Sequence, residues 1–360
     1  MTPAPSLRHL TRLSDANGIF EHALFEEPRR ELGYCTDDAG RLLRVATRLP
    51  WCHDSALLSH VSLSFLEKAY AGDGEFRLRQ RPGGEWSDDP PSDDANGRAL
   101  LGLATAAASS PWPQVRSRAL ALFETAAVWR SSYPRAMAYA AIGAADLLAT
   151  MPDHAEARRL VGDARGLLGR ADVDDAWPWP EPRLHYANAL LPDAALAVAS
   201  ALGERRAASD ALSVLGWLAE RESLGDHFSF APVGGRDPDG PQPDFDQQPI
   251  EAWAMSEACA RAYAHTHEVR WADAARRAAS WFLGSNDLGV AMFDSVTGGG
   301  FDGLESDGAN RNEGAESSMA FVAAMTVLQQ LTSETAAVPD DVAPVERPAK
   351  LQAASSASSR

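Results

Sequence analysis

The sequence predicts an all-α protein, an (α/α)6 toroid of helical hairpins with an inner and an outer ring. Runs rich in Ala and Leu with helical periodicity dominate the 360 residues. Alternating runs of Val, Ile and Thr, which would indicate strands, are sparse. The helical runs are of two kinds that alternate along the chain, as the two rings of a toroid require.

Runs of the first kind are small and apolar nearly all round, which predicts buried helices for the inner ring. They begin about 40–65 residues apart, as expected for hairpins with loops of unequal length. The predicted inner helices are 37–49, 93–108, 133–150, 184–202, 247–265 and 312–331.

Runs of the second kind are amphipathic, which predicts outer helices with one face in solvent. A sixth outer run is missing from the pattern, and we expect the N-terminal segment to close the ring instead. An α-solenoid is the alternative, but its repeats would be shorter and more uniform, with loops poorer in Trp and Asp. The predicted outer helices are 55–70, 113–129, 155–169, 206–222 and 271–284.

The composition excludes several classes of protein. The formal net charge is −17 and no basic cluster interrupts it, which argues against binding to nucleic acid or to an anionic membrane. Cys35, Cys52 and Cys259 show no CxxC spacing, so neither a disulfide framework nor a zinc site is predicted. No apolar run of about 18 residues occurs. We therefore expect a cytoplasmic protein.

The end of the chain differs in composition from the rest. Residues 332–360 are rich in Pro, Ala and Ser and contain no aromatic residue, a composition typical of disorder. The sequence thus predicts one folded domain over 1–331, followed by a disordered tail.

Polar and aromatic residues collect in the loops that precede the predicted inner helices. Examples are ELGYCTDDAGR at 31–41, DDAWPWPEPRLHYAN at 174–188 and GAES at 314–317. The inner helices of a toroid all run in one direction, so their N-termini open at one end. We therefore expect a single acidic cleft, lined by aromatic residues, at that end.

An aspartate before a helix most often caps it by accepting hydrogen bonds from backbone N–H groups. Capping alone could explain Asp37, Asp93 or Asp94, but it does not require aromatic residues in the same loops. Carboxylates beside flat rings suit carbohydrate, because sugar C–H faces stack on the rings while polar side chains bind the hydroxyls. The aromatic residues expected at the cleft are Tyr34, Trp86, Trp177, Trp179, Tyr186, Phe228 and Trp253.

Two carboxyl groups are the minimum for glycoside hydrolysis: one donates a proton, and the other activates water or attacks directly. Glu251 and Glu316 are the candidates for the acid, since each lies in the first turn of a predicted buried helix. Burial must then outweigh the helix N-terminus, which lowers a carboxyl pKa. Asp37, Asp38 and Asp94 are the candidates for the base, because their surroundings are more polar.

Other side chains of these loops are predicted to bind the substrate. The predicted substrate-binding residues are Tyr34, Trp86, Arg98, Arg135, Trp179, His185, Tyr186, Asn188, Asp246, Gln247, Gln248, Trp253, Asp302 and Asn312.

Motifs for metals and nucleotides are weak. The stretch 234–248 has spaced aspartates but lacks the glutamate that ends an EF-hand loop. The stretch VTGGGFDG at 296–303 follows neither Walker nor Rossmann spacing, and the histidines show no metal spacing. We therefore expect no metal and no cofactor.

The blocks GYCTDDAGR, SDDANGRALLGLA, HYANALLP, FDQQPIEAW and NEGAES together resemble the six-hairpin glycosidase superfamily, over about residues 10–331. In detail they resemble a bacterial group of this superfamily that is associated with glycosyltransferases. The resemblance implies activity on a glycan, often by an inverting mechanism. Related toroids also include epimerases, lyases and phosphorylases.

Several functions therefore compete. The leading hypothesis is a glycoside hydrolase acting on an oligo- or polysaccharide, or a phosphorylase that uses the same acid. The second is a non-catalytic glycan-binding protein or an accessory subunit of a glycosyltransferase. The third is an enzyme like the class II terpene cyclases, because DVDD at 172–175 matches their Asp-x-Asp-Asp proton donor. The adjoining WPWPEP suits sugars better than an isoprenoid.

Overall fold

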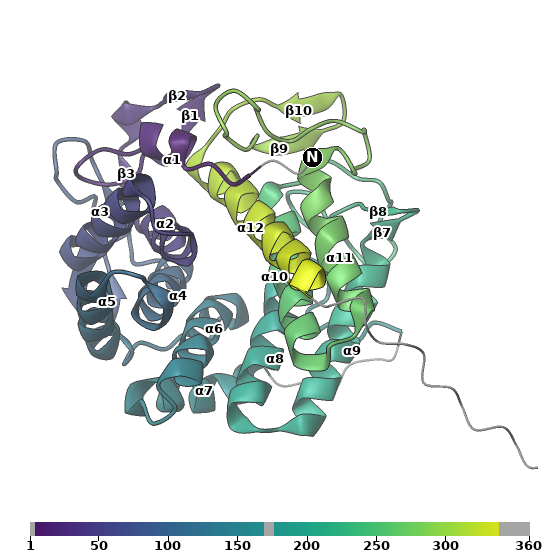
Figure 1. Ribbon diagram of the computed structural model, residues 1–360, viewed down its shortest axis with the longest axis horizontal. Coiled ribbons are helices and arrows are strands. Elements are labelled where there is room, and N and C mark those ends of the chain that lie inside the picture. Colours follow the sequence, from purple (N-terminus) through teal and green to yellow (C-terminus); the bar gives the residue numbers. More distant parts are fainter. Residues whose placement is uncertain (1–3, 169–175, 338–360) are drawn as a thin grey trace, which may run out of the picture.

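The computed structural model describes residues 4–168 and 176–337, and within them the predicted toroid is confirmed (Figure 1). Each inner helix contacts the next, and α12 contacts α2, so the inner ring is closed as a solenoid would not be. The inner helices are α2 (Thr36–Arg48), α4 (Asp93–Ser109), α6 (Pro134–Thr150), α8 (Leu190–Leu202), α10 (Pro249–Thr266) and α12 (Ala315–Ala337).

The outer helices alternate with the inner ones along the chain, as predicted. The short N-terminal helix α1 (Arg8–Arg12) contacts α12 and α3, and so takes the remaining outer position. The other outer helices are α3 (His53–Ala69), α5 (Pro113–Ala126), α7 (Ala155–Leu168), α9 (Arg205–Arg221) and α11 (Val269–Ser280).

Short antiparallel strand pairs and two 3-10 turns shape the loops between the helices. The pairs are β1 (Ala23–Leu24) with β2 (Glu27–Pro28), β3 (Tyr34–Cys35) with β6 (Arg79–Gln80), β4 (Tyr70–Gly72) with β5 (Glu75–Phe76), β7 (Ser223–Leu224) with β8 (His227–Phe228), and β9 (Gly303–Glu305) with β10 (Gly308–Asn310). The 3-10 turns are η1 (Arg30–Leu32) and η2 (Trp281–Leu283).

The two predicted boundaries that differ most from those observed belong to the fourth and sixth inner helices. The fourth inner helix was expected from residue 184, but α8 begins at Leu190, because Leu184 forms a β-bridge with Arg236 and Ala187 has a φ of 46°. At the other end, α12 continues past residue 331 to Ala337. The DVDD stretch and most of the predicted tail lie outside the described residues. No helix within the described residues is both long and apolar enough to span a bilayer.

Ion pairs occupy the interior of the inner ring below the helix N-termini. Glu257 on α10 pairs with Arg44 on α2 at 2.7 Å and also with Arg48. Arg261 on α10 reaches Asp193 on α8 at 2.6 Å and Asp146 on α6. Ion pairs as well as apolar contacts therefore join α10 to other helices of the inner ring.

Glycine allows α2 and α4 to cross closely. A Cβ atom at Gly40 would lie 2.6 Å from the carbonyl oxygen of Arg98 and 2.9 Å from the amide nitrogen of Ala99, both rigid backbone atoms. We expect Gly40→Ala to lower the free energy of unfolding by about 1–3 kcal/mol, since the two helices must separate. Urea denaturation measures this. Gly162→Ala on exposed α7, where a Cβ meets nothing within 4 Å, is the control and should stabilise the protein. Equal effects at both positions would contradict the tight crossing.

Candidate active site

A set of polar side chains near the N-terminal ends of the inner helices forms two groups of contacts, which meet at the chain neighbours Asp37 and Asp38 on α2. We call it the polar ring. It consists of Asp37, Asp38, Arg41, Asp94, Arg98, Arg135, Tyr186, Asn188, Glu251 and Glu316.

Arg41 links α2 to α12. Its Nη1 donates to Asp38 Oδ1 at 2.6 Å, and its Nη2 donates to Glu316. Asp38 is 2% exposed, and burial raises its pKa to about 7, with further contributions from Glu316 and other nearby carboxylates, although Arg41 acts in the opposite direction. The Glu316 side chain remains 36% exposed, so this carboxylate faces solvent at the open end.

Arg98 links α4 to α2 and α6. Its Nη1 donates to Asp37 Oδ1 at 2.6 Å and lies 3.5 Å from Asp94. Its Nη2 donates to the Tyr139 hydroxyl at 3.0 Å. Burial acts to raise the pKa of Asp37, but Arg98 and Arg41 outweigh it and the pKa is lowered. The pKa of Asp37 is therefore lowered while that of its neighbour Asp38 is raised, a pattern typical of acid–base sites.

Arg135 links α6 to the turn before α8. Its Nε donates to the Tyr186 carbonyl at 2.7 Å, its Nη2 donates to Asn188 Oδ1 at 3.3 Å, and it also pairs with Glu181. The guanidinium lies 5.2 Å from the centre of the Tyr186 ring. The Tyr186 hydroxyl in turn donates to Asp94, so this turn is tied to α4 as well.

Glu251 links α10 to the same turn. It accepts hydrogen bonds from the backbone amide of Asn188 at 3.1 Å, from Asn188 Nδ2 at 3.3 Å and from the Ala187 amide. These bonds hold Ala187 in its left-handed conformation. Glu251 is 3% exposed, and burial together with the nearby Glu222 raises its pKa, although the two amides act in the opposite direction.

A cavity of about 340 Å³ adjoins this part of the ring. That volume is within the range of small-molecule sites. Gly234 and Gly235 in its wall both have positive φ, which lets the loop turn tightly against residues 184–185. The lining residues are His185, Tyr186, Ala231, Pro232, Val233, Gly234, Gly235, Gln248 and Glu251. Glu316 does not line it, so the two candidate acids do not share this cavity.

A smaller cavity of about 30 Å³ lies deeper inside the inner ring. Arg41 and Arg98 are in its wall with Tyr139, and Trp253 lines it beside Arg44, whose guanidinium is 5.9 Å from the Trp253 ring. Trp253 is therefore in the floor below the polar ring.

The structure corrects the predicted positions of several aromatic residues: Tyr34, Trp179 and Phe228 lie in the hydrophobic core, and Trp86 is half-buried against it. Tyr34 stacks on Phe20 with ring centres 4.8 Å apart, and its hydroxyl donates to Asp15. Trp86 packs on Phe65 at 5.4 Å. Trp179 stacks on Trp217 at 6.1 Å. Phe65 on α3 and Trp217 on α9 contact these three rings, so the outer helices supply the apolar partners that bury them.

Gln247 and Asn312 also differ from the prediction, because their side chains form hydrogen bonds to other residues of the protein. Gln247 is fully buried, its Nε2 donates to the Asp244 carbonyl at 3.0 Å, and its Oε1 accepts from Trp281 Nε1 at 3.2 Å. Asn312 Oδ1 accepts from the Phe25 amide at 3.0 Å. Both residues position loops around the cleft.

Asp246 and Asp302 lie between α10 and α12. Asp302 Oδ1 accepts from the Gly314 amide at 2.9 Å and from the Ser317 hydroxyl, so it caps the start of α12. Burial raises the pKa of Asp302. Burial also raises the pKa of Asp246, with Glu305 and Asp302 adding to the effect. Gln248 is half-buried at the start of α10 and lines the larger cavity.

Sequence reasoning missed Arg41 and Tyr139. A signal for the arginine was present, because DDAGR at 37–41 and DDANGR at 93–98 both place Arg about one turn after a pair of aspartates. Tyr139 lies within an apolar run and carried no such signal. Among the described residues, no group of three or more His, Cys, Asp or Glu side chains could hold a metal.

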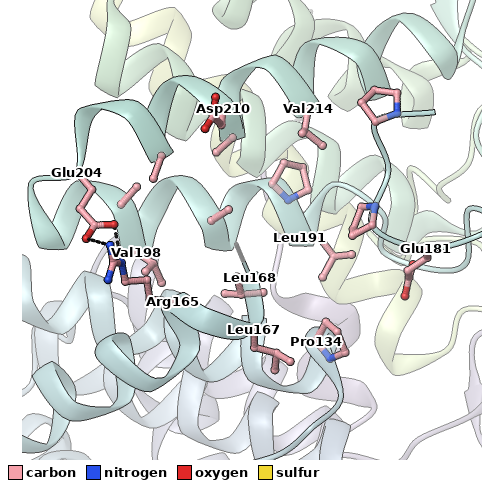
Figure 2. Close-up of a pocket in the computed structure, with 17 residues that line it drawn as sticks. Pro134, Arg165, Leu167, Leu168, Glu181, Leu191, Val198, Glu204, Asp210 and Val214 are labelled. Atoms are coloured by element: carbon pink, nitrogen blue, oxygen red, sulfur yellow. Dashed lines mark hydrogen bonds and ion pairs between the residues drawn. The ribbon is translucent and has the colours of Figure 1, made fainter. Parts of the chain in front are cut away.

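Another cavity, of about 150 Å³, lies between α8 and the outer helices α7 and α9 (Figure 2). Its wall is mainly aliphatic and proline side chains, such as Leu168, Leu191 and Val214. An ion pair between Arg165 and Glu204 lies at one end. It lacks the carboxylate network of the polar ring and is not the candidate active site.

Comparison with protein-family models and with curated protein sequences gives no match. Solved structures do share the fold. Cellobiose 2-epimerase from Bacillus thermoamylovorans B4167 is 11% identical, with a TM-score of 0.65 over 89% of this chain and 95% of that chain. The GH76 α-mannanase of Bacteroides thetaiotaomicron is 11% identical, with a TM-score of 0.59 over 91% and 93%.

The cellulase Cel9M of C. cellulolyticum, in complex with cellobiose, is 9% identical, with a TM-score of 0.58 over 88% of each chain. At these identities the likeness establishes the fold. The chain has the (α/α)6 toroid fold that these structures share.

Proposed function

We propose that the protein is a glycoside hydrolase that works by carboxyl acid–base catalysis at the polar ring. The observation that carries the proposal is the cavity of about 340 Å³, because it adjoins the polar ring and a buried carboxyl group, Glu251, is in its wall. The proteins with similar folds include a cellulase and an α-mannanase, which supports a glycan as the substrate.

Glu251 is the proposed acid. Burial raises its pKa, so it keeps a proton at a pH at which an exposed carboxyl group has lost one. Protonation of the leaving oxygen of a glycosidic bond requires such a group. Glu316, which pairs with Arg41 and is more exposed, is the alternative acid.

Asp94 is the proposed base. The Tyr186 hydroxyl donates to it, and Tyr186 also lines the cavity, so this carboxylate is connected to the cavity wall. Arg98, 3.5 Å away, supports its charge. Water activated by Asp94 would attack the sugar carbon from which the protonated oxygen departs.

The ion pairs of the arginines in the polar ring favour hydrolysis over phosphorolysis. Each arginine of the polar ring already pairs with a carboxylate: Arg41 with Asp38, Arg98 with Asp37, and Arg135 with Glu181. A phosphate co-substrate needs cationic donors that are not neutralised in this way.

A sugar epimerase or isomerase is the second candidate. His185 lines the cavity together with Glu251, and histidine is the side chain most often used to transfer protons in enzymes, which epimerisation beside a carbonyl group requires. The fold is also that of a cellobiose 2-epimerase.

One experiment separates these functions. The protein is incubated with a panel of glycans, with and without phosphate, and the products and their anomers are followed by NMR. We expect cleavage in the absence of phosphate. Cleavage that requires phosphate would identify a phosphorylase, and a new epimer without cleavage would identify an epimerase. Binding without any product would support the accessory role beside a glycosyltransferase.

A further inference from the structure

The tip of the first hairpin exposes an aromatic side chain in an unfavourable backbone conformation. Phe25 is 58% exposed and is the first residue of the two-residue turn between β1 and β2. Its φ of 50° is in the left-handed region, where a bulky residue is rare and glycine is preferred. Folding alone favours glycine here, so the aromatic ring needs another explanation.

The protein holds this residue in place through its backbone. The Phe25 amide donates to Asn312 Oδ1 at 3.0 Å, and its carbonyl accepts from the Glu313 amide at 3.0 Å. The base of the hairpin is fixed too, because the Glu21 carbonyl accepts from the Ala315 amide at 3.1 Å. The hairpin thus lies along the segment that leads into α12, where Figure 1 also shows it. Both backbone polar atoms are satisfied while the side chain is left free.

The location is beside the polar ring. Glu313 comes three residues before Glu316, whose partly exposed carboxylate belongs to that ring. A ligand that extends from the ring over the start of α12 therefore reaches the hairpin tip.

The charges around the tip indicate what kind of ligand this is. Glu26 and Glu27 follow Phe25 directly. Arg12 pairs with Glu27, but the whole chain carries a net charge of −17, so the protein as a whole repels an anionic lipid surface or a uronic acid chain. A neutral sugar has no such penalty, and its C–H face packs on an aromatic ring.

We propose that Phe25 is a platform on which a neutral sugar unit of the substrate stacks, outside the polar ring. This rests on the proposed function and deepens it: the substrate is an uncharged oligo- or polysaccharide that extends beyond a disaccharide. Phe25 is then a specificity residue for chain length.

The test compares binding of chains of different length. The probes are cello-oligosaccharides and α-mannan oligosaccharides from disaccharide to hexasaccharide, titrated into the protein by calorimetry. We expect at least one hexasaccharide to bind more tightly than its disaccharide. The length preference is the ratio of the disaccharide Kd to the hexasaccharide Kd. This ratio should fall about tenfold in Phe25→Ala and Phe25→Gly, and it should persist in Phe25→Trp.

Phe25→Gly distinguishes a binding role from a structural one. Glycine removes the strain of the positive φ and should raise the Tm, while the length preference should be lost. Leu24→Ala, which removes a neighbouring side chain that is 60% exposed, is one control. Trp51→Ala is the other, since Trp51 is 74% exposed and follows the C-terminal end of α2, at the opposite end of the toroid. Both controls should keep the preference.

A preference that is absent from the wild type, or unchanged in Phe25→Ala, overturns the proposal. Turnover is a separate readout: a length preference that depends on Phe25, without any cleavage, would reject the hydrolase while the platform stands.

Discussion

Glu251→Gln should lower kcat by a factor of about 10²–10⁴, the usual contribution of a general acid. The amide cannot give a proton to the leaving oxygen, although it has nearly the same shape as the acid. Wild-type activity should also decline on the alkaline side, because the proton is lost as the pH rises through the raised pKa of Glu251. The measurements are the kcat of both proteins and the pH dependence of the wild type, on the substrate found by NMR.

The amide could also disturb the turn that Glu251 holds, so a second variant and a fold control are needed. Asp94→Asn removes the proposed base from another helix and should lower kcat by a similar factor, with the Tm close to that of the wild type. Glu220→Gln, on the exposed face of α9, should change neither quantity. If Glu316→Gln abolished turnover while Glu251→Gln kept it, the acid would be on α12 instead.

The alternation of buried and amphipathic runs was sufficient to predict the fold, because burial around a whole helix leaves few alternatives to an inner ring. It also predicted that Asp37, Asp94, Glu251 and Glu316 lie at one end, since the first residues of parallel inner helices must meet there. These are consequences of helix direction and period, and both can be read from the order of residues.

The direction of loop side chains was not predictable in the same way. Tyr34 and Trp179 are in loops that lead to the cleft, yet their rings pack into the core. A residue's place in a loop fixes where its backbone passes, but the apolar partners that bury its ring come from distant parts of the chain. The cavity beside Glu251 was predicted only in part for the same reason: His185, Tyr186 and Gln248 were expected at the cleft, but the wall contributed by residues 231–235 was not.

Glu257→Gln should lower the free energy of unfolding at neutral pH by about 3–5 kcal/mol, the cost of leaving a buried charge without its partner. Arg44, paired with Glu257 at 2.7 Å, is itself buried and cannot turn to water, and Arg48 loses a partner as well. Urea denaturation at neutral pH measures the loss. Glu268→Gln is the matched control, because Glu268 forms an exposed pair with Arg270 and such pairs contribute about 0–1 kcal/mol.

The pH dependence of the stability difference distinguishes the loss of a charge at Glu257 from a simple loss of packing. Burial acts to raise the pKa of Glu257, but Arg44 and Arg48 outweigh it and hold the pKa at about 2. A lowered pKa means that the unfolded chain takes up a proton first. The stabilisation is therefore complete above the ordinary carboxyl pKa and is lost as the pH falls toward 2. The difference between wild type and Glu257→Gln should shrink over that acidic range, whereas a difference that stayed constant there would mean that the charge of Glu257 does not stabilise the interior of the ring.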